Sequence, residues 1–248
     1  MNRQKPSVAV ITCSLRADEK LLRTLTSIYR QTNISIASII VTPDSNIMNC
    51  GIGESSKVII RKEDGVYDAM NAGLAVAEAE YCMFLNSGDQ FMRESSVSDL
   101  FENIRNQLWG YGAIQRMYPN GKSKSYRFFP YSKFLHKYAI KYVPHPASFV
   151  HTETAKRLSG FDLRFNVSAD QKMLLQFSQL SRPLIKHGLV SAFSMDGSSA
   201  SRNYTQINQD FAQFRSSIFK SNTCEFLFRG KSLRLFEHIY NLKKSKDF

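Results

Sequence analysis

The stretch YCMFLNSGD (Tyr81–Asp89) and the segment EDGVYDAMNAGL (Glu63–Leu74) before it carry the clearest signal of how the chain folds. The earlier segment predicts a turn at its Asp-Gly pair and then a helix over 66–79, whose alanines and glycine allow close approach to a sheet. The later stretch predicts a buried strand over 81–85 that stops at a polar loop. The two together therefore indicate a helix followed by a buried strand whose end carries a carboxylate.

Asp89 stands at the end of this predicted strand. In open parallel sheets, ligands bind in the crevice beyond the carboxyl ends of the strands. A carboxylate there can hold a divalent cation that bridges phosphate oxygens, and Asn86 can supply a second oxygen. The stretch therefore predicts a metal site at Asp89 and a ligand of the nucleotide diphosphate class.

Strands and helices alternate through the first hundred residues. We expect strands at 8–13, 37–41, 57–60 and 81–85, with the first two helices around 21–29 and 66–79. Such alternation predicts an α/β fold with a mostly parallel central sheet flanked by helices.

The second half of the chain has a different pattern of predicted strands and helices. Pro119-Asn120-Gly121 predicts a hairpin between strands at 111–117 and 123–129. Further strands are expected at 147–150 and 184–193, and helices at 96–108, 131–140, 152–159, 169–180 and 204–219. No internal repeat or low-complexity tract stands out, and we predict one sheet-based domain over 1–215, with a nucleotide-binding half to about 110 and an acceptor-binding half after it.

Composition narrows the class of protein. The chain has 248 residues, of which 43% are hydrophobic, which suffices for a proper core. No export segment or membrane span is recognisable, so we expect a cytoplasmic location. The four cysteines lack the paired spacing of zinc sites or disulfide frameworks, so we expect reduced thiols.

The charge of the chain is strongly basic. A formal net charge of +12 indicates an anionic partner without distinguishing nucleic acid, phospholipid or a phosphorylated small molecule. Residues 215–248 hold eight basic and three acidic side chains interleaved with aromatic and aliphatic ones. This basic amphipathic extension, 216–248, suits either an interfacial helix on the anionic inner face of the cell membrane or a final packing helix.

Several segments, in order, resemble the inverting family-2 glycosyltransferases with the A-type fold, especially those of bacterial polysaccharide biosynthesis (lipopolysaccharide, capsule or exopolysaccharide). The matching segments are the first strand with its helix, Glu63–Leu74, Leu85–Asp89, Pro144–Phe149, and the triplets at 160–162 and 168–170. The resemblance implies transfer of a sugar from a nucleotide-diphosphate sugar donor to a hydroxyl of a glycan or lipid-linked glycan acceptor. It also implies a divalent metal, Mg or Mn.

The resemblance also implies roles on the donor side. Asp89 would hold the metal with Asn86 beside it, although the usual acidic triplet is here reduced to one carboxylate. Asp68 and Asn71 lie one helical turn apart and would contact the ribose or base of the donor. The alternative for this pair is solvation of the helix surface.

Two further donor contacts follow the second predicted strand. Members of the family usually carry an acidic Asp-Gly-Ser-type turn there, whereas this chain reads Val41-Thr42-Pro43-Asp44-Ser45. Asp44 would replace the usual acid with altered geometry, or Thr42 would contact the base through its hydroxyl. Arg202, after a late glycine-serine loop, would lie near a phosphate.

Asp170 is the candidate general base, because it matches the base of the family and opens the predicted 169–180 helix. The positive end of the helix dipole there favours a negative charge, and inverting transfer needs a group that takes the acceptor proton. A plain N-cap is the alternative. His145 stands between two prolines in a segment expected to be extended, and it would contact the leaving phosphate or the acceptor.

Two other functions compete with this interpretation. The depleted metal motif is also compatible with a catalytically weakened scaffold, against which stand the retained Asp89 and Asp170. The charge and the 29 phenylalanines and tyrosines (18 and 11) are compatible with a basic nucleic-acid-binding protein. Because no zinc-finger spacing or aromatic RNA-binding signature accompanies them, we expect no nucleic-acid partner.

Overall fold

The computed structural model describes residues 8–49, 56–62, 64–102, 104, 106–196 and 204–219. The chain divides into two units, Met1–Phe211 and Ala212–Phe248. The predicted basic extension lies outside the described residues beyond position 219, so its role and the predicted domain limits stay predictions. No helix in the described part of the chain is long and apolar enough to cross a membrane.

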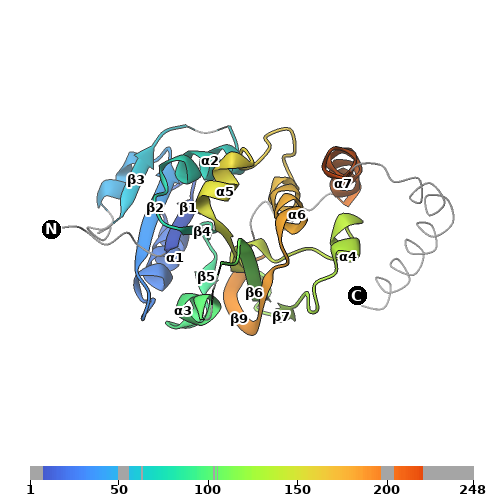
Figure 1. The fold of residues 1–248 in the computed structure, drawn as a ribbon. Helices are drawn as coiled ribbons and strands as arrows, with labels where there is room; N and C mark the ends of the chain where they lie inside the picture. The colour runs from blue at the N-terminus through green and yellow to red at the C-terminus, as the bar shows by residue number, and fades with distance from the viewer. Residues whose placement is uncertain are drawn as a thin grey trace. The chain divides into compact units, whose positions relative to one another are not determined.

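Nine strands of the described residues form one sheet, in the order β3-β2-β1-β4-β8-β6-β9-β5 with β7 paired to β6 (Figure 1). The strands are β1 Val8–Cys13, β2 Ile36–Thr42, β3 Lys57–Ile60, β4 Tyr81–Phe84, β5 Gln90–Phe91, β6 Trp109–Met117, β7 Ser123–Tyr126, β8 Ser148–His151 and β9 Leu184–Ser194. β3, β2, β1 and β4 run parallel, whereas β8 is antiparallel to both its neighbours. The predicted α/β fold is confirmed, with mixed strand directions in the second half.

The helices flank this sheet. They are α1 Glu19–Tyr29, α2 Val66–Val76, α3 Ser96–Phe101, α4 Lys133–Lys137, α5 Thr152–Arg157, α6 Ala169–Leu180 and α7 Tyr204–Ile218, with short 3-10 turns at Ser45–Asn49 (η1) and His145–Ala147 (η2). α2 and α3 end earlier than predicted, because the backbone turns to extended conformations at Ala77 and Glu102. The predicted limits of α6 are confirmed.

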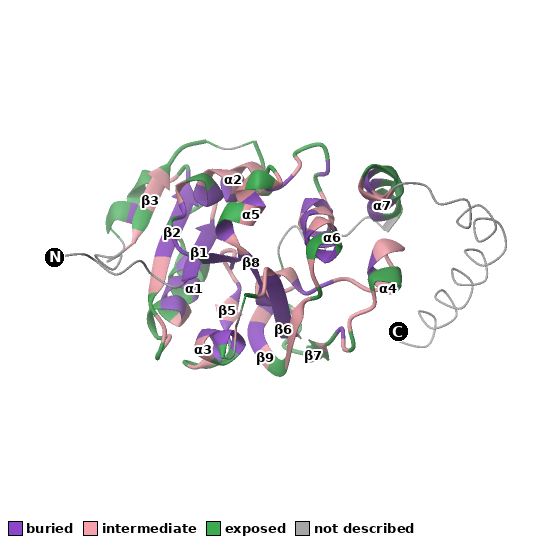
Figure 2. Cartoon of the chain, in the orientation of Figure 1, coloured by how far each residue is buried: buried purple, intermediate pink, exposed green. Residues whose placement is uncertain are grey.

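The core lies on both faces of β1. Val8 and Val10 belong to a buried cluster that includes three α1 residues, Leu21, Leu25 and Ile28. Since side chains alternate along a strand, Ala9 and Ile11 point to the other face, which α2 covers. The strands at the centre of the sheet are accordingly buried (Figure 2).

Gly73 sets how closely α2 approaches the sheet. A Cβ atom at this position would lie 2.4 Å from Cγ2 of Ile11 and 3.4 Å from Cγ2 of Val41. The helix therefore packs on β1 and β2 at a distance that a larger residue would not permit. This confirms that the small residues of α2 serve close packing, and it brings the start of α2 to the carboxyl edge of the sheet.

Candidate functional site

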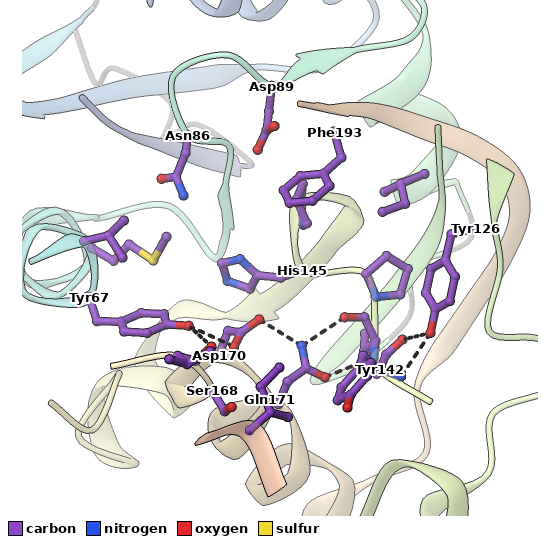
Figure 3. A pocket seen from close by; sticks show the side chains of 18 of the residues that line it. Tyr67, Asn86, Asp89, Tyr126, Tyr142, His145, Ser168, Asp170, Gln171 and Phe193 are labelled. Atoms are coloured by element: carbon purple, nitrogen blue, oxygen red, sulfur yellow. Dashed lines mark hydrogen bonds between the residues drawn. The ribbon is translucent and has the colours of Figure 1, made fainter. Parts of the chain in front are cut away.

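A cavity of about 300 Å³ lies where the loop after β4, the starts of α2 and α6, and the strands β6, β7 and β9 converge (Figure 3). Asn86, Asp89, His145 and Asp170, four of the predicted site residues, line it. They come from three separate segments of the chain. Thr42, Asp44, Asp68 and Asn71 do not line it.

Asp89 is the more buried of the two cavity carboxylates, with 4% of its surface exposed. Its Oδ1 accepts a hydrogen bond from the backbone N–H of Ser194, at 2.9 Å. Burial raises the pKa of Asp89 to about 8, the charge of Asp196 adds to this, and the Ser194 bond opposes it. On the other side, the hydroxyl of Thr24 donates to the carbonyl of Asp89 at 2.7 Å and so fixes the loop to α1.

Asn86 is the second predicted cation ligand, and it lines the same cavity as Asp89. Its Oδ1 is buried and has no hydrogen-bond partner among the described residues. An amide oxygen and a carboxylate are the hard ligands that Mg²⁺ and Mn²⁺ accept, and a cation would supply the charge that the buried Asp89 lacks. No group of three or more His, Cys, Asp or Glu side chains among the described residues forms a metal site. A cation here would therefore depend on ligand oxygens and water for most of its coordination.

Asp170 lies in the first turn of α6, as predicted, and is held by two side chains. Its Oδ1 accepts from the hydroxyl of Tyr67 at 3.0 Å, and its Oδ2 accepts from Nε2 of Gln171 at 2.8 Å. Tyr67 belongs to α2, so this contact joins the two helices that face the cavity (Figure 3). The carboxylate is thus oriented by residues that the sequence analysis did not select.

Gln171 connects Asp170 to a buried polar chain. Its Nε2 also donates to the carbonyl of Val143, while its Oε1 accepts from the N–H of Val143 and contacts Nε2 of His136 at 3.0 Å. Burial lowers the pKa of His136 to about 4, so its ring is neutral. Because Oε1 can only accept, the proton of His136 sits on Nε2, and Nδ1 accepts from the hydroxyl of Tyr131. All four hydrogen-bonding positions of Gln171 are therefore occupied.

His145 is clamped between aromatic rings at the cavity. Its ring stacks on Phe84 with centroids 5.4 Å apart and meets the edge of Phe161 at 5.7 Å. Burial lowers its pKa, and Nε2 has no hydrogen-bond partner among the described residues. The expected extended segment is wrong: His145 begins a 3-10 turn, closed by the bond from the N–H of Ala147 to the carbonyl of Pro144.

Thr42 and Asp44 are engaged within the loop after β2. The hydroxyl of Thr42 accepts from the N–H of Asp44 at 3.1 Å. The Asp44 carboxylate accepts from the N–H groups of Ala17 and Asn46, and these bonds lower its pKa. Contact between these two residues and a nucleotide base stays a prediction.

Asp68 and Asn71 also have protein partners. Asp68 pairs with Arg61 at 3.6 Å, and Asn71 bonds both the N–H and the carbonyl of Phe161 at 2.8 Å each. Their contact with the donor stays a prediction as well. Arg202 lies outside the described residues.

Comparison with known proteins gives relatives in both sequence and structure. No protein-family model matches the chain. Two proteins from two strains of Mycobacterium tuberculosis, each named an uncharacterized glycosyltransferase, are 28% identical to it over 217 residues, which cover 83% of this chain and 81% of theirs.

Solved structures with the same fold include TarS residues 1–349 from S. aureus, in complex with UDP-GlcNAc, and the mannosyltransferase PcManGT from Pyrobaculum calidifontis, in complex with GDP-Man and Mn²⁺. The TM-scores are 0.63 and 0.64, each at 12% identity. The matches cover 86% and 89% of this chain, and 71% and 66% of those chains. The names of the two relatives in sequence, together with the fold shared with TarS and the mannosyltransferase, confirm the resemblance of the chain to glycosyltransferases with the A-type fold.

Proposed function

We propose that the chain is an inverting family-2 glycosyltransferase that moves a sugar from a nucleotide-diphosphate sugar to a hydroxyl of a glycan or lipid-linked glycan. The observation that carries this proposal is the convergence of Asp89, Asn86, His145 and Asp170 on one cavity at the sheet edge. The donors bound by the two structural neighbours support a nucleotide sugar as the ligand. A role in polysaccharide biosynthesis at the inner face of the cell membrane is part of the same proposal.

Asp170 is the general base of the proposed reaction. The acceptor hydroxyl gives its proton to the Asp170 carboxylate while its oxygen forms a bond to the anomeric carbon. The bond from that carbon to the diphosphate oxygen breaks, and the electron pair leaves with the diphosphate. Tyr67 and Gln171 hold both carboxylate oxygens, so the proton acceptor is oriented before the substrate arrives.

Asn86 and Asp89 form the donor-phosphate side. Both residues line the cavity, and the raised pKa of Asp89 marks a carboxyl group that a neighbouring cation would help to ionise. A bound Mg²⁺ or Mn²⁺ would neutralise the charge that develops on the departing diphosphate. His145, whose pKa is lowered by burial, would contact a phosphate or acceptor oxygen through Nε2.

A thermal-shift screen tests the donor site. The native protein is heated with UDP, GDP and their sugars, with and without Mg²⁺ or Mn²⁺, beside an Asp89→Ala variant. A ligand that binds only the native state raises the melting temperature, by an amount set by its affinity. We expect a metal-dependent shift with one nucleotide that is lost in Asp89→Ala. Absence of a shift with every nucleotide would contradict the proposal and favour the scaffold alternative.

A further inference from the structure

Arg116 supplies an unused positive charge to the cavity. It is the one lysine or arginine among the described residues that line the cavity, and no carboxylate of the described residues pairs with it. Its guanidinium carbon lies 4.3 Å from the ring centroid of Tyr126, which also lines the cavity. A guanidinium over a ring keeps its in-plane N–H groups for a ligand.

The ring that carries Arg116 is fixed in place. The hydroxyl of Tyr126 donates to the carbonyl of Tyr142 at 2.8 Å and accepts from the N–H of the same residue at 3.0 Å. The β6–β7 hairpin is thereby fastened to the loop that leads to His145. Arg116 therefore packs on an aromatic ring that two hydrogen bonds hold in place.

A second cation stands next to the first. In the β6–β7 ladder Arg116 is directly opposite Lys124, and Ile114 is opposite Tyr126. Since alternate residues of a strand share a face, Lys124 lies on the same face as Tyr126, which faces the cavity. Like charges directly opposite each other weaken a sheet, and no acidic partner of Lys124 is present among the described residues. This pair of charges suits an anionic ligand.

The position of the pair indicates which substrate carries the anion. Tyr126 and Tyr142 lie on the side of the cavity away from Tyr67 and Asn86, with His145 and Asp170 between the two sides (Figure 3). If the acceptor hydroxyl meets Asp170, then the group beyond it, toward Tyr126, belongs to the acceptor. Asn86 lies on the opposite side of the cavity from Tyr126, and that side remains for the donor (Figure 3).

We propose that Arg116, assisted by Lys124, binds an anionic group of the acceptor, so that the acceptor class is a phosphate-bearing or carboxylate-bearing glycan. This inference rests on the proposed function, because it takes Asp170 as the base. The shared chemistry is a compact anion with two or more oxygens, which a guanidinium binds through paired N–H groups. The anion comes either from a phosphate, as in a lipid-linked diphosphate, or from an acidic sugar.

The test is a titration on the full chain with its donor site filled. Inorganic phosphate, glucuronate and, as a neutral reference, glucose are titrated by calorimetry into protein saturated with UDP or GDP, at constant ionic strength. Phosphate or glucuronate should bind and glucose should not. Arg116→Gln should weaken the anion at least tenfold, and Lys124→Gln two- to threefold. The control Arg127→Gln, an exposed arginine next to Tyr126 that does not line the cavity, should change it less than twofold.

The outcomes separate this inference from the proposed function. Tighter binding of phosphate would identify a phosphorylated acceptor. Tighter binding of glucuronate would identify an acceptor that contains acidic sugars. If Arg116→Gln weakens UDP or GDP tenfold as well, Arg116 serves the donor diphosphate and the acceptor assignment is wrong. If neither anion binds, or both bind Arg116→Gln as they bind the wild type, the subsite is wrong while nucleotide binding still supports a transferase. Loss of all nucleotide binding in the wild type would instead overturn the proposed function.

Discussion

The region around Asp89 and the region around Asp170 present a carboxylate to the same cavity but hold it differently. Asp89 is almost fully buried behind the β4 end, and its carboxylate accepts from the backbone N–H of Ser194. Asp170 is partly exposed in the first turn of α6 and receives side-chain hydrogen bonds from Tyr67 and Gln171. The region around Asp89 excludes solvent from the carboxyl group, whereas the region around Asp170 orients its carboxylate through hydrogen bonds.

The two environments suit aspartate to two different tasks. A carboxyl group whose pKa is raised by burial gains most from a cation, because the cation restores the ionised form. A carboxylate fixed at both oxygens suits proton transfer, which depends on direction and distance. Two nearby carboxyl groups that lie in different surroundings commonly have different catalytic roles.

The largest effect is expected at Asp170. Asp170→Asn keeps the shape of the side chain and removes the proton acceptor, so the transfer rate should fall about 10³-fold, within the range for general base catalysis. The melting temperature and nucleotide affinity should not change. Initial rates of sugar transfer measure this, with Asp99→Asn as control, because Asp99 also accepts side-chain bonds in the first turn of a helix but does not line the cavity. A variant that retains a tenth of the rate would exclude Asp170 as the base.

The next effect concerns the stability of the metal-free protein. The pKa of Asp89 is about 8 when folded and near its ordinary value of 3.8 when unfolded. The unfolded state therefore loses its proton first, and the free energy of unfolding falls as pH rises from about 4 to 8, by up to about 1.4 kcal/mol per pH unit. The Asp89→Asn variant has no titrating group at this position, so its free energy of unfolding does not fall for this reason.

Urea unfolding in EDTA measures the comparison. Between pH 5 and pH 7.5, the stability of Asp89→Asn should rise relative to the wild type by about 3 kcal/mol. Adding Mn²⁺ with the donor nucleotide should stabilise the wild type and leave the variant unchanged. Parallel stability curves in EDTA would mean that Asp89 is already ionised when folded, and the contrast with Asp170 would disappear.

A smaller effect on rate is expected at Gln171, which acts through Asp170 as a positioning residue. Gln171→Glu keeps an oxygen for Val143 and His136 and replaces the donor to Asp170 by a like charge. The rate kcat should fall about tenfold with the donor KM unchanged, and the acidic limb of the pH–rate profile should move to higher pH. Gln179→Glu, on the exposed side of the same helix, is the control. An unshifted pH profile would reduce Gln171 to a structural role.

Local pattern predicted the parallel half of the fold well. The limits of β1, β3 and α6 follow from runs and periods that the sequence displays directly. The strand order of the second half does not, since β8 lies between β4 and β6 although it follows both in the chain. Such pairings are set by how the whole sheet packs, and no window of sequence contains that information.

The site shows the same limit. Asn86, Asp89, His145 and Asp170 converge because strand ends and helix starts meet at one edge of the sheet. Tyr67 and Asp170 are 103 residues apart in the sequence, and the residues around neither position predict their contact. A sequence shows which residues carry chemistry, but it does not show which of their oxygens the protein itself already uses.

Asn71 makes that last point testable, because its predicted role and its observed contacts differ. Asn71→Ala removes two hydrogen bonds to the backbone of Phe161, so the free energy of unfolding should fall by about 1–2 kcal/mol. Since these bonds fasten α2 to the segment before α6, nucleotide affinity should stay within twofold. Urea unfolding and calorimetry measure the two quantities, with Asn166→Ala, an exposed cavity residue, as control. A tenfold loss of nucleotide affinity at unchanged stability would instead make Asn71 a donor contact and extend the donor region onto α2.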